Sequence, residues 1–300
     1  MSDNLTQEII GEPVNIDQSK TNNEENNKNS QNFSSNELQQ DEIDAFNLLF
    51  INCPSSSEEE VTIHSWKKTA IGLYMGEYNQ KGKRHGRGIL IQENGDRYEG
   101  YWKNGRKSGK GKYYFSDGNI YEGYFQDDFM NGVGTLKYTN GDKYEGDWIN
   151  GKKSGKGKYF YISGNIYEGD YKDNVKDGKG VFTYVNGAKY EGNWKNDMKD
   201  GKGKFIYASG NEYEGDYKKD LKHGYGVFKF VQGNHYEGEW NKDKIEGYGK
   251  YFYSSGNKYY GNWKDDKKNG KGNFYNSETG TWEKGIWKNG KLKCTISQNN

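Results

Sequence analysis

One short phrase recurs along this chain at a fixed spacing and constrains the fold more than any other feature. It consists of an aromatic residue, usually a glutamate, a glycine, any residue and a second aromatic residue. The first step between copies is 24 residues and every later step is 23. The leading aromatic residues are Tyr74, Tyr98, Tyr121, Tyr144, Tyr167, Tyr190, Tyr213, Tyr236, Tyr259 and Trp282. This spacing predicts a repeat array of nine full units, 74–281, and a truncated tenth, in which each unit buries its apolar face by stacking on its neighbours.

The repeat 98–120 shows how one unit folds. Tyr98, Gly100 and Trp102 alternate with other residues and therefore fall on one face of a β-strand. The pair Asn104-Gly105 suits a tight turn, and a second alternating segment follows it. We therefore predict an all-β fold, an elongated, twisted, single-sheet antiparallel meander of about nine to ten 23-residue hairpins.

Each repeat carries glycines at fixed places. Those at the third and fourteenth places share a face with the aromatic residues, where a side chain would collide with a neighbouring ring. Those at the twelfth and twenty-first places are expected to permit turn conformations that a Cβ atom resists.

The chain outside the repeats divides by composition. Residues 1–36 are rich in Asn, Gln, Ser and Glu and are predicted to be a disordered acidic tail. Residues 37–65 are predicted to hold a short amphipathic helix, with its apolar face in 43–50, and an acidic linker. The repeat array is expected over 66–290 and a polar C-terminal tail over 291–300.

The charge of +1 conceals an asymmetry between the tail and the array. Residues 1–65 carry 13 acidic and 2 basic residues, whereas the rest of the chain carries 30 acidic and 42 basic residues. Two interpretations of the acidic tail remain open: it adds solubility, or it screens the basic array from an anionic partner. The short helix likewise either docks on the array or recruits another protein.

The repeated motifs resemble a known family. The phrases YEGYW…GKG, YEGDW…GKG and YEGNW…GKG at 23-residue spacing are similar to MORN repeats (membrane occupation and recognition nexus), from residue 74 to about 290. The pattern departs at Tyr74-Met75-Gly76, at Tyr259-Tyr260-Gly261 and at Trp282. The resemblance implies an extended sheet of hairpins with a scaffolding or membrane–cytoskeleton role, as in junctophilins and radial-spoke head proteins.

No set of residues predicts catalysis. The stretch GKKSGKGK at 151–158 lacks the Ser or Thr that follows Gly-Lys in a phosphate-binding loop. The four histidines show no metal-ligand spacing. A glutamate at the second place of most repeats forms a ladder, which pairing with lysines or backbone donors on the neighbouring hairpin explains better than acid–base chemistry. We therefore expect no enzyme, no cofactor and no metal.

A second period of 46 residues distinguishes alternate repeats. At the fifteenth place Lys112, Lys158, Lys204 and Lys250 alternate with Thr135, Val181, Val227 and Asn273. At the seventeenth place Tyr114, Phe160, Ile206 and Phe252 alternate with Lys137, Thr183, Lys229 and Tyr275. Both places lie on the face opposite the main aromatic stack. The candidate partner-binding residues are Tyr114, Phe160, Ile206, Phe252, Val181 and Val227, and the expected occupant is a helix or a second copy of the array, which would make a homodimer.

Two functions remain open from the sequence. The first is a non-catalytic scaffold or protein–protein interaction rod that links cytoskeletal, ciliary or membrane-associated components. The second is a peripheral membrane module that binds anionic phospholipids or phosphoinositides. Its candidate residues are Lys110, Lys112, Lys156, Lys158, Lys202 and Lys204. We expect no nucleic-acid partner, because the aromatic residues are used in packing. The start of the chain, MSDNLTQEII, shows no signal peptide, and two cysteines 241 residues apart form no disulfide framework, so a cytoplasmic location is expected.

Overall fold

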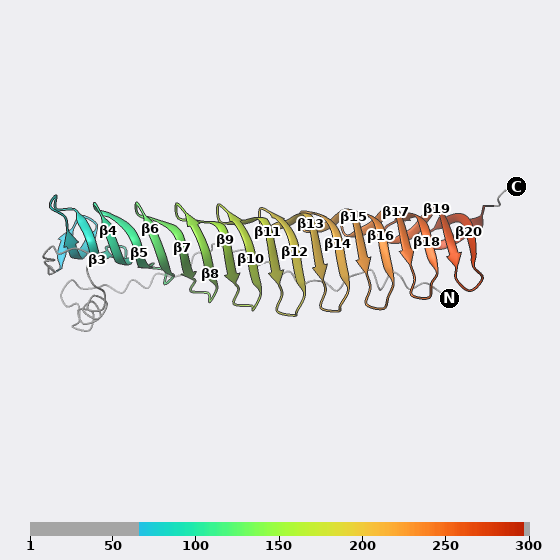
Figure 1. Ribbon diagram of the computed structural model, residues 1–300, viewed down its shortest axis with the longest axis horizontal. Helices are drawn as coiled ribbons and strands as arrows, with labels where there is room; N and C mark the ends of the chain where they lie inside the picture. Colours follow the sequence, from blue (N-terminus) through green and yellow to red (C-terminus); the bar gives the residue numbers. More distant parts are fainter. Residues whose placement is uncertain (1–65, 297–300) are drawn as a thin grey trace. The chain divides into compact units, whose positions relative to one another are not determined.

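The computed structural model describes residues 66–296 as one antiparallel sheet (Figure 1). The described residues form 21 strands and no helix, and each strand pairs with the one before it and the one after it. The sheet runs as a long twisted ribbon in which the strands lie across its length. The predicted all-β meander of hairpin repeats is therefore confirmed. No helix in the described part of the chain is long and apolar enough to span a membrane.

The strands follow the repeat closely, with a shorter strand at the start of each unit and a longer strand at its end. Their bounds are β1 Lys67–Thr69, β2 Gly72–Tyr78, β3 Arg84–Gln92, β4 Arg97–Lys103, β5 Arg106–Tyr114, β6 Ile120–Gln126, β7 Phe129–Lys137, β8 Lys143–Ile149, β9 Lys152–Phe160, β10 Ile166–Lys172, β11 Val175–Thr183, β12 Lys189–Lys195, β13 Met198–Ile206, β14 Glu212–Lys218, β15 Leu221–Lys229, β16 His235–Asn241, β17 Lys244–Phe252, β18 Lys258–Lys264, β19 Lys267–Asn276, β20 Thr281–Lys288 and β21 Lys291–Thr295.

Two kinds of turn form the two long edges of the sheet. Within a repeat, β4 and β5 are joined by Asn104 and Gly105, whose φ angles of 53° and 91° define the tight turn that matches strand twist. Between repeats, the amide of Phe115 donates a hydrogen bond to the carbonyl of Asn119 at 2.9 Å. Gly118, at the twenty-first place, has a φ of 89° in that turn. The expected role of this glycine is confirmed.

The glycine at the twelfth place has a different role from the one predicted. Gly109 lies inside β5 with a φ of 71°, where the pairing with β4 shifts register between Gly100 and Trp102. This irregularity is a β-bulge, which bends the strand. The expectation that this glycine serves a turn was therefore wrong, because the positive φ is required by the bulge.

One face of the sheet holds the aromatic residues, and we call it the aromatic face. The Tyr98 ring lies over Gly100 and Gly111, where an added Cβ would come within 2.5 Å of the Tyr98 hydroxyl oxygen in both cases. The Tyr98 hydroxyl donates a hydrogen bond to the carbonyl of Tyr101 at 2.9 Å. Its ring packs edge-on against Trp102 with centroids 5.1 Å apart. The glycines of the third and fourteenth places thus make room for the rings, as predicted.

The array extends further than the sequence predicts at its C-terminal end. Residues 291–295 form β21, which pairs with β20, although we predicted a polar tail from residue 291. All five residues of β21 are exposed, so its composition is that of a polar edge strand. The predictions for the tail 1–36 and for the helix and linker 37–65 lie outside the described residues.

Candidate binding face

The face opposite the aromatic residues carries the side chains that vary from repeat to repeat, and we call it the groove face. Cross-strand pairing arranges these side chains in three rows along the sheet. Between β5 and β6, for example, Lys110 pairs with Tyr124, Lys112 with Glu122 and Tyr114 with Ile120. We name the rows by their distance from the two-residue turns. The near row holds the fourth and thirteenth places, the middle row the second and fifteenth, and the far row the seventeenth and twenty-third.

The groove face is hollowed over its central repeats. A groove of about 1560 Å³ runs from Glu145 on β8 to Glu237 on β16. Its lining includes the exposed backbone of glycines and side chains of the rows, among them Lys156, Val181 and Val227. A groove of this length spans several repeats and offers room for an extended partner rather than for a small ligand.

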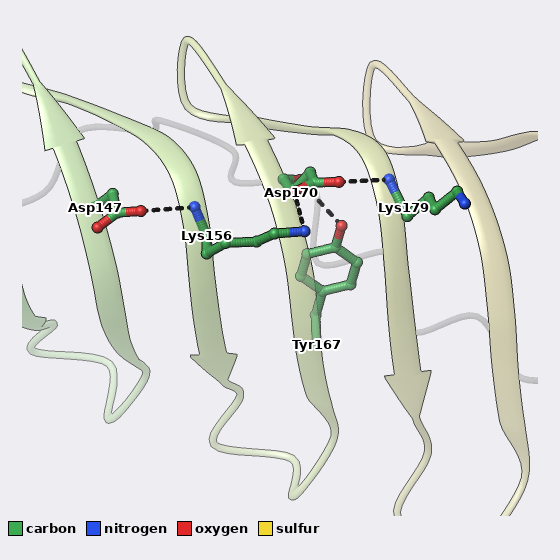
Figure 2. A network of polar contacts seen from close by, with 5 residues as sticks. All are labelled: Asp147, Lys156, Tyr167, Asp170 and Lys179. Atoms are coloured by element: carbon green, nitrogen blue, oxygen red, sulfur yellow. Dashed lines mark hydrogen bonds and ion pairs between the residues drawn. The ribbon is translucent and has the colours of Figure 1, made fainter.

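Carboxylates at the fourth place hold the bulges and the near row together (Figure 2). The Asp147 carboxylate accepts a hydrogen bond from the Lys156 amide at 2.8 Å, and Asp170 accepts one from the Lys179 amide at 2.8 Å. The Lys156 ammonium also contacts Asp170 on the next strand. Partial burial tends to raise the pKa of the Asp170 carboxyl, but the Lys156 side chain and the Lys179 backbone amide together lower it. These carboxylates therefore stabilise the bulges and also add negative charge to the groove.

The structure places the predicted apolar residues in two different rows. Tyr114, Phe160, Ile206 and Phe252 are half-buried in the far row, whereas Val181 and Val227 lie in the middle row. Cations or rings already contact the three aromatic residues of this far-row set, Tyr114, Phe160 and Phe252. The Lys143 ammonium lies 4.2 Å from the Phe160 ring centroid, and His235 stacks on Phe252 at 4.3 Å. The apolar side chains are thus separate spots divided by charged ones.

Four of the six candidate lipid-binding lysines form ion pairs with carboxylates on neighbouring strands. The pairs are Lys156 with Asp170, Lys158 with Glu168, Lys202 with Asp216 and Lys204 with Glu212. Within residues 66–296, Lys110 and Lys112 form no such pair, and the Lys112 ammonium lies 5.1 Å from the Tyr114 ring centroid. The basic charge of this face is therefore largely offset.

The glutamate ladder forms ion pairs at several positions, but most of these pairs are not with the neighbouring hairpin, where the sequence predicted them. Glu99 contacts Arg97 and Glu145 contacts Lys143 on its own strand, while Glu168 contacts Lys158 across strands. Pairing with a lysine of the neighbouring hairpin is therefore confirmed at Glu168, whereas the Glu99 and Glu145 pairs lie within one strand.

Sequence reasoning missed four exposed tyrosines in the near row. Tyr101, Tyr124, Tyr225 and Tyr248 expose 42%, 51%, 55% and 51% of their surface. Tyr101 and Tyr124 take the fourth place, where most other repeats carry Asp or Glu, and Tyr225 and Tyr248 take the thirteenth, where most carry Lys. The signal was present in the sequence as a tyrosine at a place that is otherwise charged.

Sequence reasoning also missed a row of lysines on the aromatic face, at the tenth place of the repeats. The row consists of Lys107, Lys153, Lys176, Lys199, Lys222 and Lys268. The Lys222 ammonium lies 4.7 Å from the Trp240 ring centroid and 5.2 Å from that of Phe228. Burial lowers the pKa of Lys222, while Asp243 opposes this shift. The aromatic rings stabilise these cations, of which Lys199, Lys222 and Lys268 are buried and the others half-buried, so the row belongs to the framework.

The repeats themselves decide the family. The MORN repeat matches nine consecutive segments, which are residues 74–97, 98–120, 121–143, 144–166, 167–189, 190–212, 213–235, 236–258 and 259–277. This chain belongs to the MORN repeat family. A comparison with curated proteins finds no match. No group of three or more His, Cys, Asp or Glu side chains in the described part of the MORN array is placed to hold a metal ion.

Solved structures resemble the MORN array only weakly. The TCP10 domain of Danio rerio CPAP, in complex with a peptide of STIL, has 13% identity and a TM-score of 0.45, with 75% of this chain and 97% of that chain covered. The SAS-4 TCP domain of Drosophila melanogaster, in complex with a proline-rich motif of Ana2, has 14% identity and a TM-score of 0.34, with 59% and 90% covered. At such low TM-scores these similarities carry no argument about function.

Proposed function

We propose that this protein is a non-catalytic scaffold whose MORN array binds proteins along the groove face. We place it in the cytoplasm, where it would link cytoskeletal, ciliary or membrane-associated components. The proposal rests on one observation, which is that the two faces of the sheet differ in how their side chains are used. The aromatic face is filled by the rings of the repeat itself, whereas the groove face presents a groove of about 1560 Å³ with exposed side chains that differ between repeats.

The chemistry of the groove face is that of a protein interface. Exposed tyrosines supply large contact areas with few rotatable bonds, and tyrosine is enriched at interaction hot spots. Carboxylates and lysines alternate between them, as in the Lys202–Asp216 and Lys204–Glu212 pairs. Such mixed charge gives specificity towards a partner of complementary pattern.

The same pattern favours protein over lipid as the ligand. An anionic membrane is attracted by unbalanced basic charge at about 1 kcal/mol per residue near the surface. In Lys156, Lys158, Lys202 and Lys204 that charge is offset by a contacting carboxylate. Only Lys110 and Lys112 of the six candidates lack such a pair within the described residues, so lipid binding remains the weaker alternative.

A comparison of two triple variants tests the proposal. The groove-face variant carries Phe160→Asp, Ile206→Asp and Phe252→Asp, and the matched control carries Ile162→Asp, Val185→Asp and Val231→Asp. The control residues are exposed in the turns between repeats, at 72%, 71% and 61%. Both variants are expressed at native level in the cell of origin, and co-purified proteins are quantified against the unchanged chain.

We expect the groove-face variant to lose its specific protein partners and the control to keep them. Circular dichroism confirms that both arrays remain folded. Sedimentation with vesicles of phosphatidylcholine alone, or with phosphoinositide added, measures lipid binding in parallel. Equal partner sets for both variants, or salt-sensitive vesicle binding that only the unchanged chain shows, would contradict the proposal.

A further inference from the structure

The charges of the groove face are arranged by strand parity. In the middle row, every glutamate of the second place lies on an even-numbered strand, from Glu99 on β4 to Glu237 on β16. The lysines of the fifteenth place lie on odd-numbered strands, and they are Lys112 on β5, Lys158 on β9, Lys204 on β13 and Lys250 on β17. An operation that brings the odd strands β5–β17 onto the even strands β4–β16 therefore places these lysines opposite glutamate and never opposite lysine, while the remaining glutamates face Thr135, Val181 or Val227.

A two-fold rotation of a second copy performs this operation. If the axis runs parallel to the strands, between two facing groove faces, the second copy has the reverse strand order and each row lies opposite itself. An axis placed between β10 and β11 sets β4 opposite β17, β5 opposite β16 and β6 opposite β15 of the second copy. The paired numbers always sum to 21, so even strands always face odd strands.

This placement makes the near row complementary to itself. Lys110 on β5 comes opposite Glu239 of the second copy, and Asp147 on β8 comes opposite its Lys202. Close to the axis, Asp170 on β10 faces Lys179 on β11 of the second copy.

The exposed tyrosines of the near row also meet in this placement. Tyr101 on β4 faces Tyr248 on β17 of the second copy, and Tyr124 on β6 faces its Tyr225 on β15. All four exposed near-row tyrosines are thereby paired, which is the arrangement in which aromatic residues contribute most to an interface.

Facing residues of the two copies are also complementary in the middle and far rows. In the middle row Lys112 faces Glu237 of the second copy, and Glu145 faces its Lys204. In the far row Phe160 faces Lys189 of the second copy, a cation–π pair. Over strands β2–β19 no like charges face each other in any of the three rows.

Other registers lose this complementarity. A shift of one strand brings Glu145 opposite Glu214 and Lys158 opposite Lys204, which sets like charges against each other. A shift of two strands in one direction keeps opposite charges together in the near and middle rows. In the far row it sets Arg97 against Lys229 and Lys137 against Lys189, and in the near row it sets Tyr124 against Lys202. Charge excludes the one-strand shift and disfavours this two-strand shift, and only the unshifted register pairs all four exposed tyrosines of the near row.

We propose that the groove face binds a second copy of this chain, antiparallel and face to face, with the two-fold axis between β10 and β11. The inference rests on the proposed use of the groove face as a protein-binding surface and names its partner. Stacked sheets lie about 10 Å apart, so side chains of the three rows interdigitate between the two sheets. The assembly is a closed dimer, because each copy uses the same face.

Charge reversal at one predicted contact tests both the dimer and its register. Lys110 and Glu239 are exposed and lie eleven strands apart in one chain, so they meet only between copies. Lys110→Glu sets two glutamates opposite two glutamates in its homodimer, and Glu239→Lys sets lysines opposite lysines. In a mixed dimer of the two variants both contacts again join a glutamate to a lysine.

Sedimentation equilibrium of the full chain, at low and moderate salt, measures the dimer dissociation constant. We expect each variant alone to raise this constant by about tenfold or more. An equimolar mixture should return it to within about threefold of the unchanged chain. The control mixture of Lys110→Glu with Glu191→Lys should show no recovery, because Glu191 on β12 faces Lys158 of the second copy.

Glu239 also accepts a hydrogen bond from the Tyr248 amide at 3.1 Å, so its variant needs a control for folding. Glu239→Gln keeps an oxygen acceptor and removes the charge, and we expect it to weaken the dimer less than Glu239→Lys does. A monomeric unchanged chain at its highest soluble concentration overturns the dimer but leaves the groove face open to other proteins. A dimer that ignores both reversals, or recovery in the control mixture, overturns the register.

Discussion

The aromatic face and the groove face are built from the same strands but obey different rules. On the aromatic face, the leading tyrosine of nine repeats, from Tyr74 to Tyr259, is fully buried. On the groove face, the same array exposes 51% of Tyr124 and 55% of Tyr225 where other repeats carry charged side chains. The difference shows that one face specifies the fold and leaves the other free to vary for recognition.

Backbone spacing explains why the aromatic face cannot vary. Each leading tyrosine lies over two glycines, and Trp102 donates a hydrogen bond to the carbonyl of Gly88 on the preceding hairpin at 3.1 Å. A change in one repeat therefore disturbs the next. On the groove face the side chains extend from the sheet, so a substitution changes only its immediate neighbours.

The largest effect is expected from alkaline pH, which should unfold the array by ionising the buried tyrosines of the aromatic face. Burial is the largest cause that raises the pKa of the leading tyrosines above 10.0 in the folded chain, and it raises the pKa of Tyr184 to about 12. A raised folded pKa contributes stability that is present below pH 10 and is lost as the pH rises. The buried lysines act in the opposite direction, because burial lowers the pKa of Lys199 and Lys222. The tyrosines outnumber them, so we expect cooperative unfolding above pH 10.

Circular dichroism and tyrosinate absorbance, recorded together during a pH titration, check this prediction. Loss of sheet structure should coincide with ionisation of the buried tyrosines. Full ionisation while the sheet signal persists would contradict the expected coupling.

Truncation of an aromatic side chain to alanine should lower the unfolding free energy much more on the aromatic face than on the groove face. Trp148 is 3% exposed and donates a hydrogen bond to the Gly134 carbonyl at 3.2 Å, whereas Tyr248 is 51% exposed. Removal of a buried aromatic side chain costs about 3–5 kcal/mol, so we expect Trp148→Ala to lower the unfolding free energy by that amount. At protein concentrations where the chain is monomeric, Tyr248→Ala should change it by less than about 0.5 kcal/mol. Urea denaturation of both variants measures the contrast, and equal losses would refute it.

Alanine substitution of two adjacent residues on opposite faces should change the unfolding free energy by different amounts. An added Cβ at Gly157 would come within 2.4 Å of the Tyr144 hydroxyl oxygen, and the neighbouring Lys158 is on the groove face. We expect Gly157→Ala to lower the unfolding free energy by about 1–3 kcal/mol through overpacking. The matched change Lys158→Ala should cost less than about 1 kcal/mol. Thermal unfolding of the two variants provides the measurement, and a Gly157→Ala array as stable as the unchanged chain would show that the ring yields.

The smallest effect is expected from an ion pair of the groove face. Lys158 and Glu168 lie 3.0 Å apart with side chains 40% and 65% exposed. Exposed pairs of this kind contribute about 0.2–1 kcal/mol and weaken in salt. A double-mutant cycle with Lys158→Ala and Glu168→Ala should give a coupling energy in that range. A larger coupling that salt does not reduce would mean that the groove face also supports the fold.

Sequence periodicity predicted the faces of the strands but not the bulge. The alternation of Tyr98, Gly100 and Trp102 assigns each side chain to a face, because strand geometry has a period of two. It gave no sign that Gly109 lies in a bulge, so the contact between the fourth and thirteenth places across that bulge could not be predicted. Sequence reasoning therefore singled out Lys110, Lys156 and Lys202 of the near row without placing them beside the fourth-place residues, and it overlooked the four tyrosines. The strand 291–295 was missed because a polar edge strand lacks an apolar face.

The sequence by itself determined the repeat, the hairpin, the family and the glycines that the rings require, since all of these depend on residues close together in the chain. Only the tertiary structure decided which side chains of different repeats share a row, how the lysines pair with carboxylates and where the groove lies. These features depend on strand register and on the bulges, which place residues about 20 positions apart in contact, as between Lys107 and Asp128. Local patterns do not record that register, because it is fixed by packing across the whole sheet.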